Sequence, residues 1–116
     1  LVRLSLVRAK FCEQLALQSR FKDYSSELFL MGLFSLIDSI LDTQMDAIMD
    51  KLPIPDEIKD ALSSETGDFM PFLKAIVAYE RAEVAACADA VNQVGVAMKL
   101  IPEIYFESLR YANALT

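Results

Sequence analysis

The stretch from Ser25 to Asp42, SSELFLMGLFSLIDSILD, is the longest run of the chain in which nearly every side chain is apolar. Wound at about 3.6 residues per turn, it places a broad apolar arc on one side and a polar strip on the other. An arc this wide needs several neighbouring helices, because a single helix covers only a narrow seam. The pattern therefore predicts a central apolar helix over 25–42, around which the rest of the chain folds. Its predicted buried face comprises Phe29, Leu30, Leu33, Phe34, Leu36, Ile37, Ile40 and Leu41.

The rest of the chain also shows helical periodicity. A first amphipathic helix is expected over 1–19, followed after 42 by short helices over 43–52 and 56–62. Longer helices are expected over 68–80, 84–94 and from Pro102 to about 112. No segment alternates with a period of two, so no strand is predicted. The sequence thus predicts an all-α protein, an irregular multi-helix bundle.

The size of the chain fits one domain. It has 116 residues, of which 54% are hydrophobic, enough for one ordinary core and too few for two. We therefore expect a single helical domain over 1–116. The sequence opens at Leu1 within a helical pattern, which leads us to expect a fragment of a longer protein.

Arg8 interrupts the apolar stripe of the first helix. Two explanations remain open at this stage. Either the aliphatic stem of Arg8 carries the guanidinium group outward to solvent, or the guanidinium group pairs with a carboxylate such as that of Asp38 or Glu13.

The charge of the chain limits its partners. With 17 acidic against 11 basic residues the net charge is −6, which repels nucleic acid. The carboxylates within 25–42 argue against a membrane span, because charges are costly at the centre of a bilayer. Cys12 and Cys87 lie within helical patterns and far apart, which favours buried free thiols over a disulfide. Free thiols favour a reducing compartment, so we expect a cytoplasmic location.

The residues needed for catalysis are scarce. The chain has no histidine, which removes the usual general base and a common transition-metal ligand. Asp38 and Asp42 lie four residues apart on one helix face, but a solvated polar arc explains them better than an acid/base pair. The remaining acidic cluster lacks the spacing of a calcium loop and is interpreted as a solvated face; it comprises Asp46, Asp50, Asp56, Glu57 and Asp60. We predict no catalytic, cofactor-binding or metal-binding residue.

Three aromatic residues in the last predicted helix are candidates for a protein interaction. Tyr105, Phe106 and Tyr111 are aromatic, and two carry a polar tip of the kind favoured at interfaces. Packing against the core is the alternative, and it is the one that the pattern favours.

Several motifs resemble a known family. They are GLFSLIDSIL at 32–41, LPIP at 52–55, AYER at 78–81 and YFESLRYA at 105–112. Together they are similar to the C-terminal half of an HDOD domain, in the branch that follows an EAL domain in bacterial cyclic-di-GMP signalling proteins. The resemblance spans essentially all 116 residues. It implies an HD-domain-like helical fold and a signalling role, and it allows for a catalytic EAL-type domain before these residues.

The resemblance also implies the loss of catalysis. Where a catalytic HD relative carries its His-Asp dyad, this chain carries Ser35 and Leu36, which cannot hold a divalent metal. Two positions depart from the HDOD branch, which has glycine where this chain has Ala82 and tryptophan where it has Val84.

Three functions follow as hypotheses. The leading one is a non-catalytic regulatory module that binds proteins, either other domains of the same chain or a second copy, with no nucleic acid and no membrane. The second is a divergent HD-type phosphohydrolase using Asp38 and Asp42. The third is a structural oligomerisation domain with the last helix as its dimer face.

Overall fold

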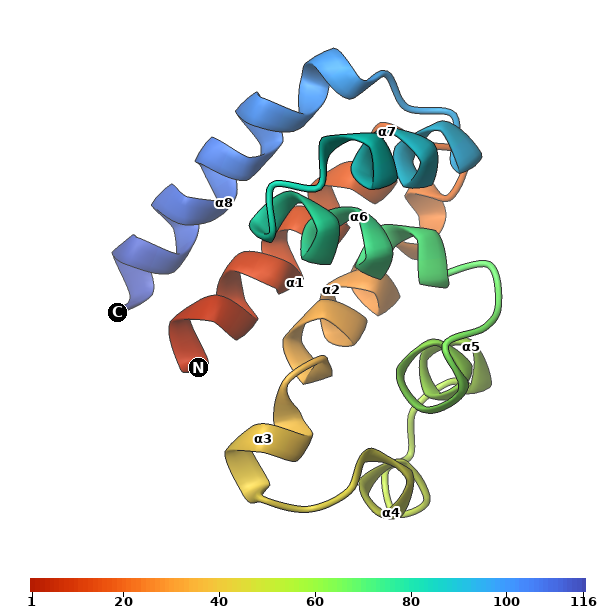
Figure 1. Cartoon of the computed structure of the whole chain (residues 1–116). Coiled ribbons are helices and arrows are strands. Elements are labelled where there is room, and N and C mark those ends of the chain that lie inside the picture. The colour runs from red at the N-terminus through yellow and green to blue at the C-terminus, as the bar shows by residue number, and fades with distance from the viewer.

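A computed structural model describes all residues from 1 to 116, and every regular element in it is helical (Figure 1). The prediction of an all-α bundle is therefore confirmed. The α-helices and the shorter η-helices, in order, are α1 (Val2–Leu17), η1 (Lys22–Tyr24), α2 (Ser25–Phe34), α3 (Ile37–Leu41), α4 (Met45–Met49), α5 (Asp56–Lys59), η2 (Asp60–Ser64), α6 (Met70–Glu80), α7 (Val84–Gln93), η3 (Met98–Leu100) and α8 (Ile101–Leu115).

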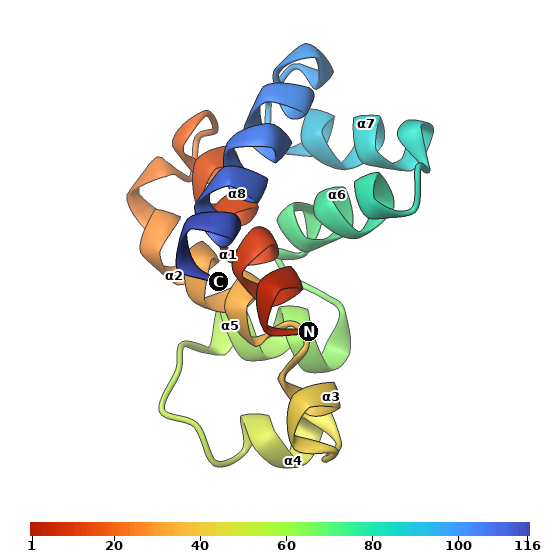
Figure 2. The ribbon, with the colours of Figure 1, turned by 90° about the vertical axis from the view of Figure 1, so that its left-hand side faces the viewer.

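The central element is α1, and not the predicted helix over 25–42. Helix α1 packs against α2, α6 and α8, and it runs between them in two perpendicular views (Figures 1 and 2). Of its apolar residues at helical spacing, Val7, Phe11 and Leu15 are buried, while Leu4 is half-buried. A second buried row consists of small residues, Ser5, Ala9, Cys12 and Ala16. Because this row lets a neighbouring backbone approach closely, α1 can be covered on more than one side.

The segment 25–42 differs from its prediction, because it breaks at Ser35 and Leu36 into α2 and α3. Helix α2 buries Leu28, Met31 and Gly32, whereas the predicted arc is only half-buried along α2 and is exposed at its far end. The predicted buried face was wrong, because it includes none of the three residues that α2 buries. Periodicity could not show which side of the helix its neighbour approaches.

Gly32 explains which side of α2 faces the core. A Cβ added at this position would lie 2.5 Å from the backbone oxygen of Arg8 and 2.7 Å from Cα of Ala9. The absence of a side chain thus brings the backbones of α1 and α2 together at this point. Gly32 thereby fixes the side of α2 that faces the core.

A second layer, formed by α3, α4, α5 and η2, extends from one end of the bundle (Figure 2). The Pro-Ile-Pro segment at 53–55 separates α4 from α5, as predicted. Five apolar side chains of this layer are buried, which joins it to the core: Ile48, Met49, Ile58, Ala61 and Leu62.

Helices α6 and α7 both end in the same hydrogen-bond pattern. After α6, Ala82 N–H donates to Tyr79 O (3.1 Å) and Glu83 N–H to Ala78 O (2.9 Å). The equivalent bonds after α7 run from Gly95 to Asn92 O and from Val96 to Val91 O, both at 3.0 Å. These are Schellman motifs, in which the first residue beyond the cap has a positive φ. Here φ is 59° at Ala82 and 78° at Gly95. A left-handed residue is therefore needed at position 82, where the HDOD branch has glycine.

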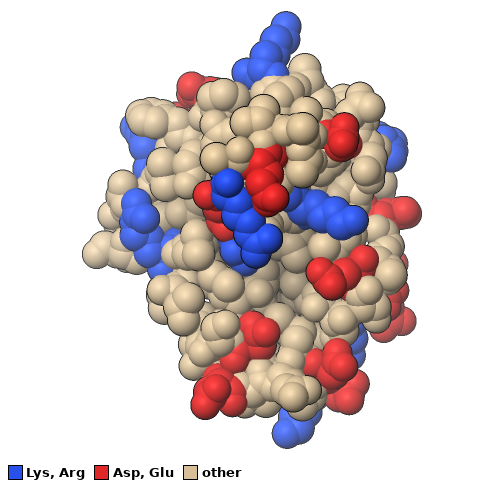
Figure 3. Space-filling model, viewed as in Figure 1, with Lys and Arg blue, Asp and Glu red and all other residues tan.

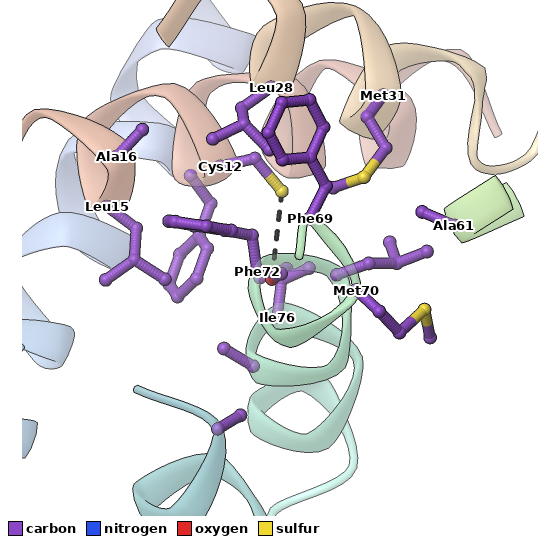
Figure 4. Packing of buried hydrophobic residues seen from close by; sticks show 14 of the residues in the cluster. Cys12, Leu15, Ala16, Leu28, Met31, Ala61, Phe69, Met70, Phe72 and Ile76 are labelled. Atoms are coloured by element: carbon purple, nitrogen blue, oxygen red, sulfur yellow. Dashed lines mark hydrogen bonds between the residues drawn. The ribbon is translucent and has the colours of Figure 1, made fainter. Parts of the chain in front are cut away.

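The core lies where α1, α2 and α6 meet. Phe72 and Ile76 of α6 belong to one buried cluster with Leu15 of α1 and Leu28 of α2 (Figure 4). The ring of Phe21 packs edge-on against Phe72, with centroids 5.7 Å apart. The Cα radius of gyration is 13.2 Å, close to the roughly 13.4 Å expected of one compact domain of this length.

No helix on its own has both the length and the apolar character needed to cross a bilayer. Only α7 taken together with the segment 98–115 reaches that length and composition, and these two are bent by 111° relative to each other.

Candidate functional site

Ser35 and Leu36, where the resemblance implies that a catalytic relative carries its His-Asp dyad, lie at the break between α2 and α3. Ser35 is the first of the two residues at the break, and its hydroxyl donates to Gly32 O at 2.7 Å. The Oγ of Ser35 accepts a hydrogen bond from Nη1 of Arg8 at 3.3 Å. Leu36 is half-buried and begins the turn into α3. The site is therefore built by α1 and α2, at the point where Gly32 brings them together.

Arg8 is held by a carboxylate that the sequence analysis did not name. Its Nε and Nη2 donate to Oε2 and Oε1 of Glu80 at 3.0 and 2.7 Å, a two-point ion pair. The two side chains are only 12% and 15% exposed. Both predicted partners were wrong, since Glu13 pairs with Lys10 at 2.8 Å and Asp38 accepts from the Ser39 N–H at 2.9 Å. The outward extension of Arg8 is excluded by the same geometry.

The reason for this pairing is the position of α6. Arg8 points away from solvent into the junction of α1, α2 and α6, where Glu80 is the last residue of α6. Sequence separation hid the pair, because the two residues are 72 positions apart. The available signal was Glu80 within the AYER motif, which the resemblance had already identified.

The Arg8 guanidinium cannot act as a metal ligand, because it offers only hydrogen-bond donors and has no lone pair for a metal. It lies within hydrogen-bond distance of Ser35, and the Glu80 carboxylate that balances its charge is engaged by two of its hydrogen bonds. No group of three or more His, Cys, Asp or Glu side chains in the chain is arranged to hold a metal ion.

Asp38 and Asp42 lie on one shallow surface depression of about 320 Å³, together with Ser39, Thr43 and Gln44. The two carboxylates thus share a face, as predicted. Asp42 is exposed and has a left-handed backbone with φ of 51°, which ends α3. The depression contains no third carboxylate and no cationic side chain. The arrangement matches a solvated polar face.

The five residues of the acidic cluster that was predicted to be a solvated face are all exposed, as that prediction requires. They lie on α4, α5 and the adjoining turns, and acidic side chains gather over the same end of the molecule in Figure 3. They are Asp46, Asp50, Asp56, Glu57 and Asp60.

The structure does not bring the three aromatic candidates of α8 together. The ring of Tyr105 lies against Tyr79 of α6, with centroids 4.9 Å apart. Tyr111 packs edge-on against Phe29 of α2 at 6.2 Å. Only Phe106 is well exposed, at 55%. Tyr105 and Tyr111 therefore pack α8 against its neighbours. A protein interaction through this helix stays a prediction, and Phe106 is the one of the three residues that is exposed for it.

Both cysteines are buried and free, which confirms the prediction for the thiols. Burial raises the pKa of Cys12 from 9.0 to about 12, opposed by the nearby charge of Arg8. The Cys12 thiol donates a weak hydrogen bond to Phe72 O at 3.8 Å. Burial also raises the pKa of Cys87. Neither thiol is therefore a ready nucleophile, because the thiolate is the reactive form.

Two known proteins resemble the chain over nearly its whole length. One is the cyclic di-GMP phosphodiesterase CdgJ of Vibrio cholerae, 30% identical over 113 residues, which are 97% of this chain and 26% of CdgJ. The other is the uncharacterised protein YuxH of Bacillus subtilis, 30% identical over 115 residues, which are 99% of this chain and 27% of YuxH. The chain spans about a quarter of the length of each. No protein-family model matches it, and no solved structure does. The chain is therefore homologous to one segment of each of these two longer proteins.

Proposed function

We propose that this chain is a non-catalytic regulatory module of bacterial cyclic-di-GMP signalling, of the HDOD type, which acts in the cytoplasm through contacts with other proteins. Its similarity to a segment of a cyclic di-GMP phosphodiesterase supports the signalling role. The motifs at 32–41, 52–55, 78–81 and 105–112 support the assignment to the HDOD type. Two free buried thiols fit the reducing cytoplasm.

One observation carries the non-catalytic part of the proposal. The Arg8 guanidinium donates to Ser35 at the first position of the former dyad, and Glu80 fixes it there through two hydrogen bonds. A metal-dependent hydrolase needs anionic or imidazole ligands where this chain has a cation, a hydroxyl and the aliphatic Leu36. The phosphodiesterase activity in the name of CdgJ is consequently not assigned to these residues.

Metal-dependent turnover provides the test. The purified chain is incubated with cyclic di-GMP, and separately with bis(p-nitrophenyl) phosphate, in the presence of Mn²⁺, Ni²⁺ or Mg²⁺. We expect no product above the buffer control and no shift of the melting temperature on addition of the metal, because no ligand set is present. Reproducible metal-dependent turnover would refute the proposal.

Substitutions would then identify the source of any activity. The phosphohydrolase hypothesis requires Asp38→Asn/Asp42→Asn to abolish turnover, while the exposed pair Asp56→Asn/Asp60→Asn serves as the control. The oligomerisation hypothesis predicts a dimer that Phe106→Gln dissociates, because this aromatic side chain is the exposed one of the three on α8. Sedimentation velocity at several concentrations tests that outcome.

A further inference from the structure

An apolar groove runs between the N-terminal half of α1 and the α2–α3 segment. Val2 and Leu6 of α1 form one wall, and Phe34, Ile37, Ile40 and Leu41 form most of the other. The exposed fractions are 43% for Ile40, 56% for Leu41 and 61% for Val2. Because apolar side chains of this size are normally covered, a cluster of them marks a candidate contact surface.

The groove owes its existence to the break at Ser35. In one continuous helix these side chains would lie along the face predicted to be buried. Because the chain turns between α2 and α3, no other element of the structure covers Ile40 and Leu41. The groove is thus the uncovered end of the predicted apolar arc.

Ser5 lies beneath the same groove. It is only 3% exposed, and its hydroxyl oxygen is buried without a hydrogen-bond partner, as that of Ser63 is in η2. Because a molecule on the surface cannot reach a fully buried oxygen, the groove offers apolar contacts only.

The segment that begins with α3, one wall of the groove, is strongly negative, whereas the α1 wall carries Arg3 next to Val2. Residues 36–64 carry seven of the 17 acidic side chains and two of the 11 basic ones, so this segment holds five of the six net negative charges. Asp38 and Asp42 lie on α3, the helix that also supplies Ile40 and Leu41. A partner with positive charges beside its apolar face would complement this surface.

The size of the groove indicates the kind of occupant. Its volume is about 260 Å³, below the roughly 300–1,000 Å³ usual for small-molecule pockets. It suits a few side chains from one face of a helix laid along it. A second copy of this chain would bring a second acidic segment 36–64 to the same surface, so repulsion between like charges disfavours that occupant. An anionic lipid surface is disfavoured for the same reason.

We propose that this groove docks an amphipathic helix of a partner protein, whose apolar face fills the groove and whose flanks carry Lys or Arg. The proposal rests on the proposed function and specifies the chemistry of the protein contact. Leu41, Ile40 and Phe34 provide the apolar contacts, and Asp38 and Asp42 the charge complement.

The test uses two designed peptides as probes. Both are 18-residue fluorescein-labelled helices with the same leucine positions, and their polar faces consist of lysine in one and glutamate in the other. Fluorescence anisotropy measures the binding of each peptide to the chain. We expect saturable binding of the Leu/Lys helix and binding at least about tenfold weaker for the Leu/Glu helix, because the charges flanking the groove are acidic.

Matched variants separate the groove from the rest of the surface. Ile40→Gln/Leu41→Gln should weaken binding of the Leu/Lys helix by about tenfold or more, because it removes the apolar contacts without changing the charge. The control Val84→Gln/Leu100→Gln alters two other exposed apolar side chains, on α7 and η3, and should change binding by less than about twofold. Asp38→Asn/Asp42→Asn should weaken binding and reduce its dependence on salt.

Each contrary outcome has a separate meaning. Equal binding of the two peptides, or equal effects of the two apolar double variants, overturns the docking proposal. A dimer in sedimentation velocity that Ile40→Gln/Leu41→Gln dissociates also overturns it, because the groove would then bind a second copy. Loss of the docking proposal leaves the non-catalytic function standing, since only metal-dependent turnover refutes that.

Discussion

The substitution Gly32→Ala tests the packing on which the whole arrangement depends. A methyl group at this position would lie 2.5 Å from the backbone oxygen of Arg8, whereas ordinary contact begins at 3.4 Å. The atoms that it meets belong to the backbone of α1, so no side-chain rotation relieves the clash. The two helices must move apart locally by up to about 0.9 Å.

The expected magnitude is the difference between two effects. Overpacking costs about 1–3 kcal/mol, and a clash with backbone atoms belongs near the upper end, about 3 kcal/mol. Alanine offsets about 1 kcal/mol of that cost, because its helix propensity is higher than that of glycine. We expect a net loss of about 2 kcal/mol in the free energy of unfolding. At about 4 °C per kcal/mol for a chain of this length, the melting temperature should fall by about 8 °C.

Urea unfolding followed by circular dichroism measures this loss. The matched control is the exposed residue Asp89 on α7, where Asp89→Ala and Asp89→Gly differ only in helix propensity and should separate by about 1 kcal/mol. If Gly32→Ala is as stable as the unmodified chain, or more stable, the close approach of α1 and α2 does not limit the packing, and the reasoning is refuted.

Three further predictions concern the helix ends, the ion pair and the buried thiol. Ala82→Gly should stabilise the chain by about 1 kcal/mol and Gly95→Ala should destabilise it by about as much, because both positions have a positive φ; thermal unfolding that gives both the same sign would contradict this. Glu80→Ala should cost about 3 kcal/mol, because it leaves the Arg8 charge buried and unpaired, and Arg8→Met/Glu80→Leu should recover most of that loss in urea unfolding; a double variant no more stable than Glu80→Ala would count against it. Since the pKa of Cys12 is about 12 in the folded chain and 9.0 in its ordinary state, the unfolded chain loses this proton first as the pH rises, so stability should fall between about pH 9 and pH 12. Urea unfolding at about pH 8 and about pH 10.5 should show a smaller fall for Cys12→Ala, and equal falls for the two proteins would exclude this contribution.

The site was only partly predictable from the sequence. The spacing of Asp38 and Asp42 placed both on one face, and the structure has them on one depression. Arg8 was recognised as a charge within an apolar stripe that needed an explanation, but its partner Glu80 lies 72 residues away. Helical periodicity relates residues within a few turns, so it carries no information on pairs formed between distant helices.

The sequence by itself determined the helical class, the approximate limits of most helices and the burial of the two thiols. It could do so because helical periodicity, proline and glycine act locally along the chain. Tertiary structure alone decided that α1 is the central helix, that 25–42 breaks at Ser35, and that Ile40 and Leu41 remain uncovered. Those outcomes depend on where two backbones can touch, and at Gly32 the contact with α1 selects one side of α2. The apolar arc of 25–42 predicts that a large surface must be buried, and tertiary packing decides which part of that surface is buried.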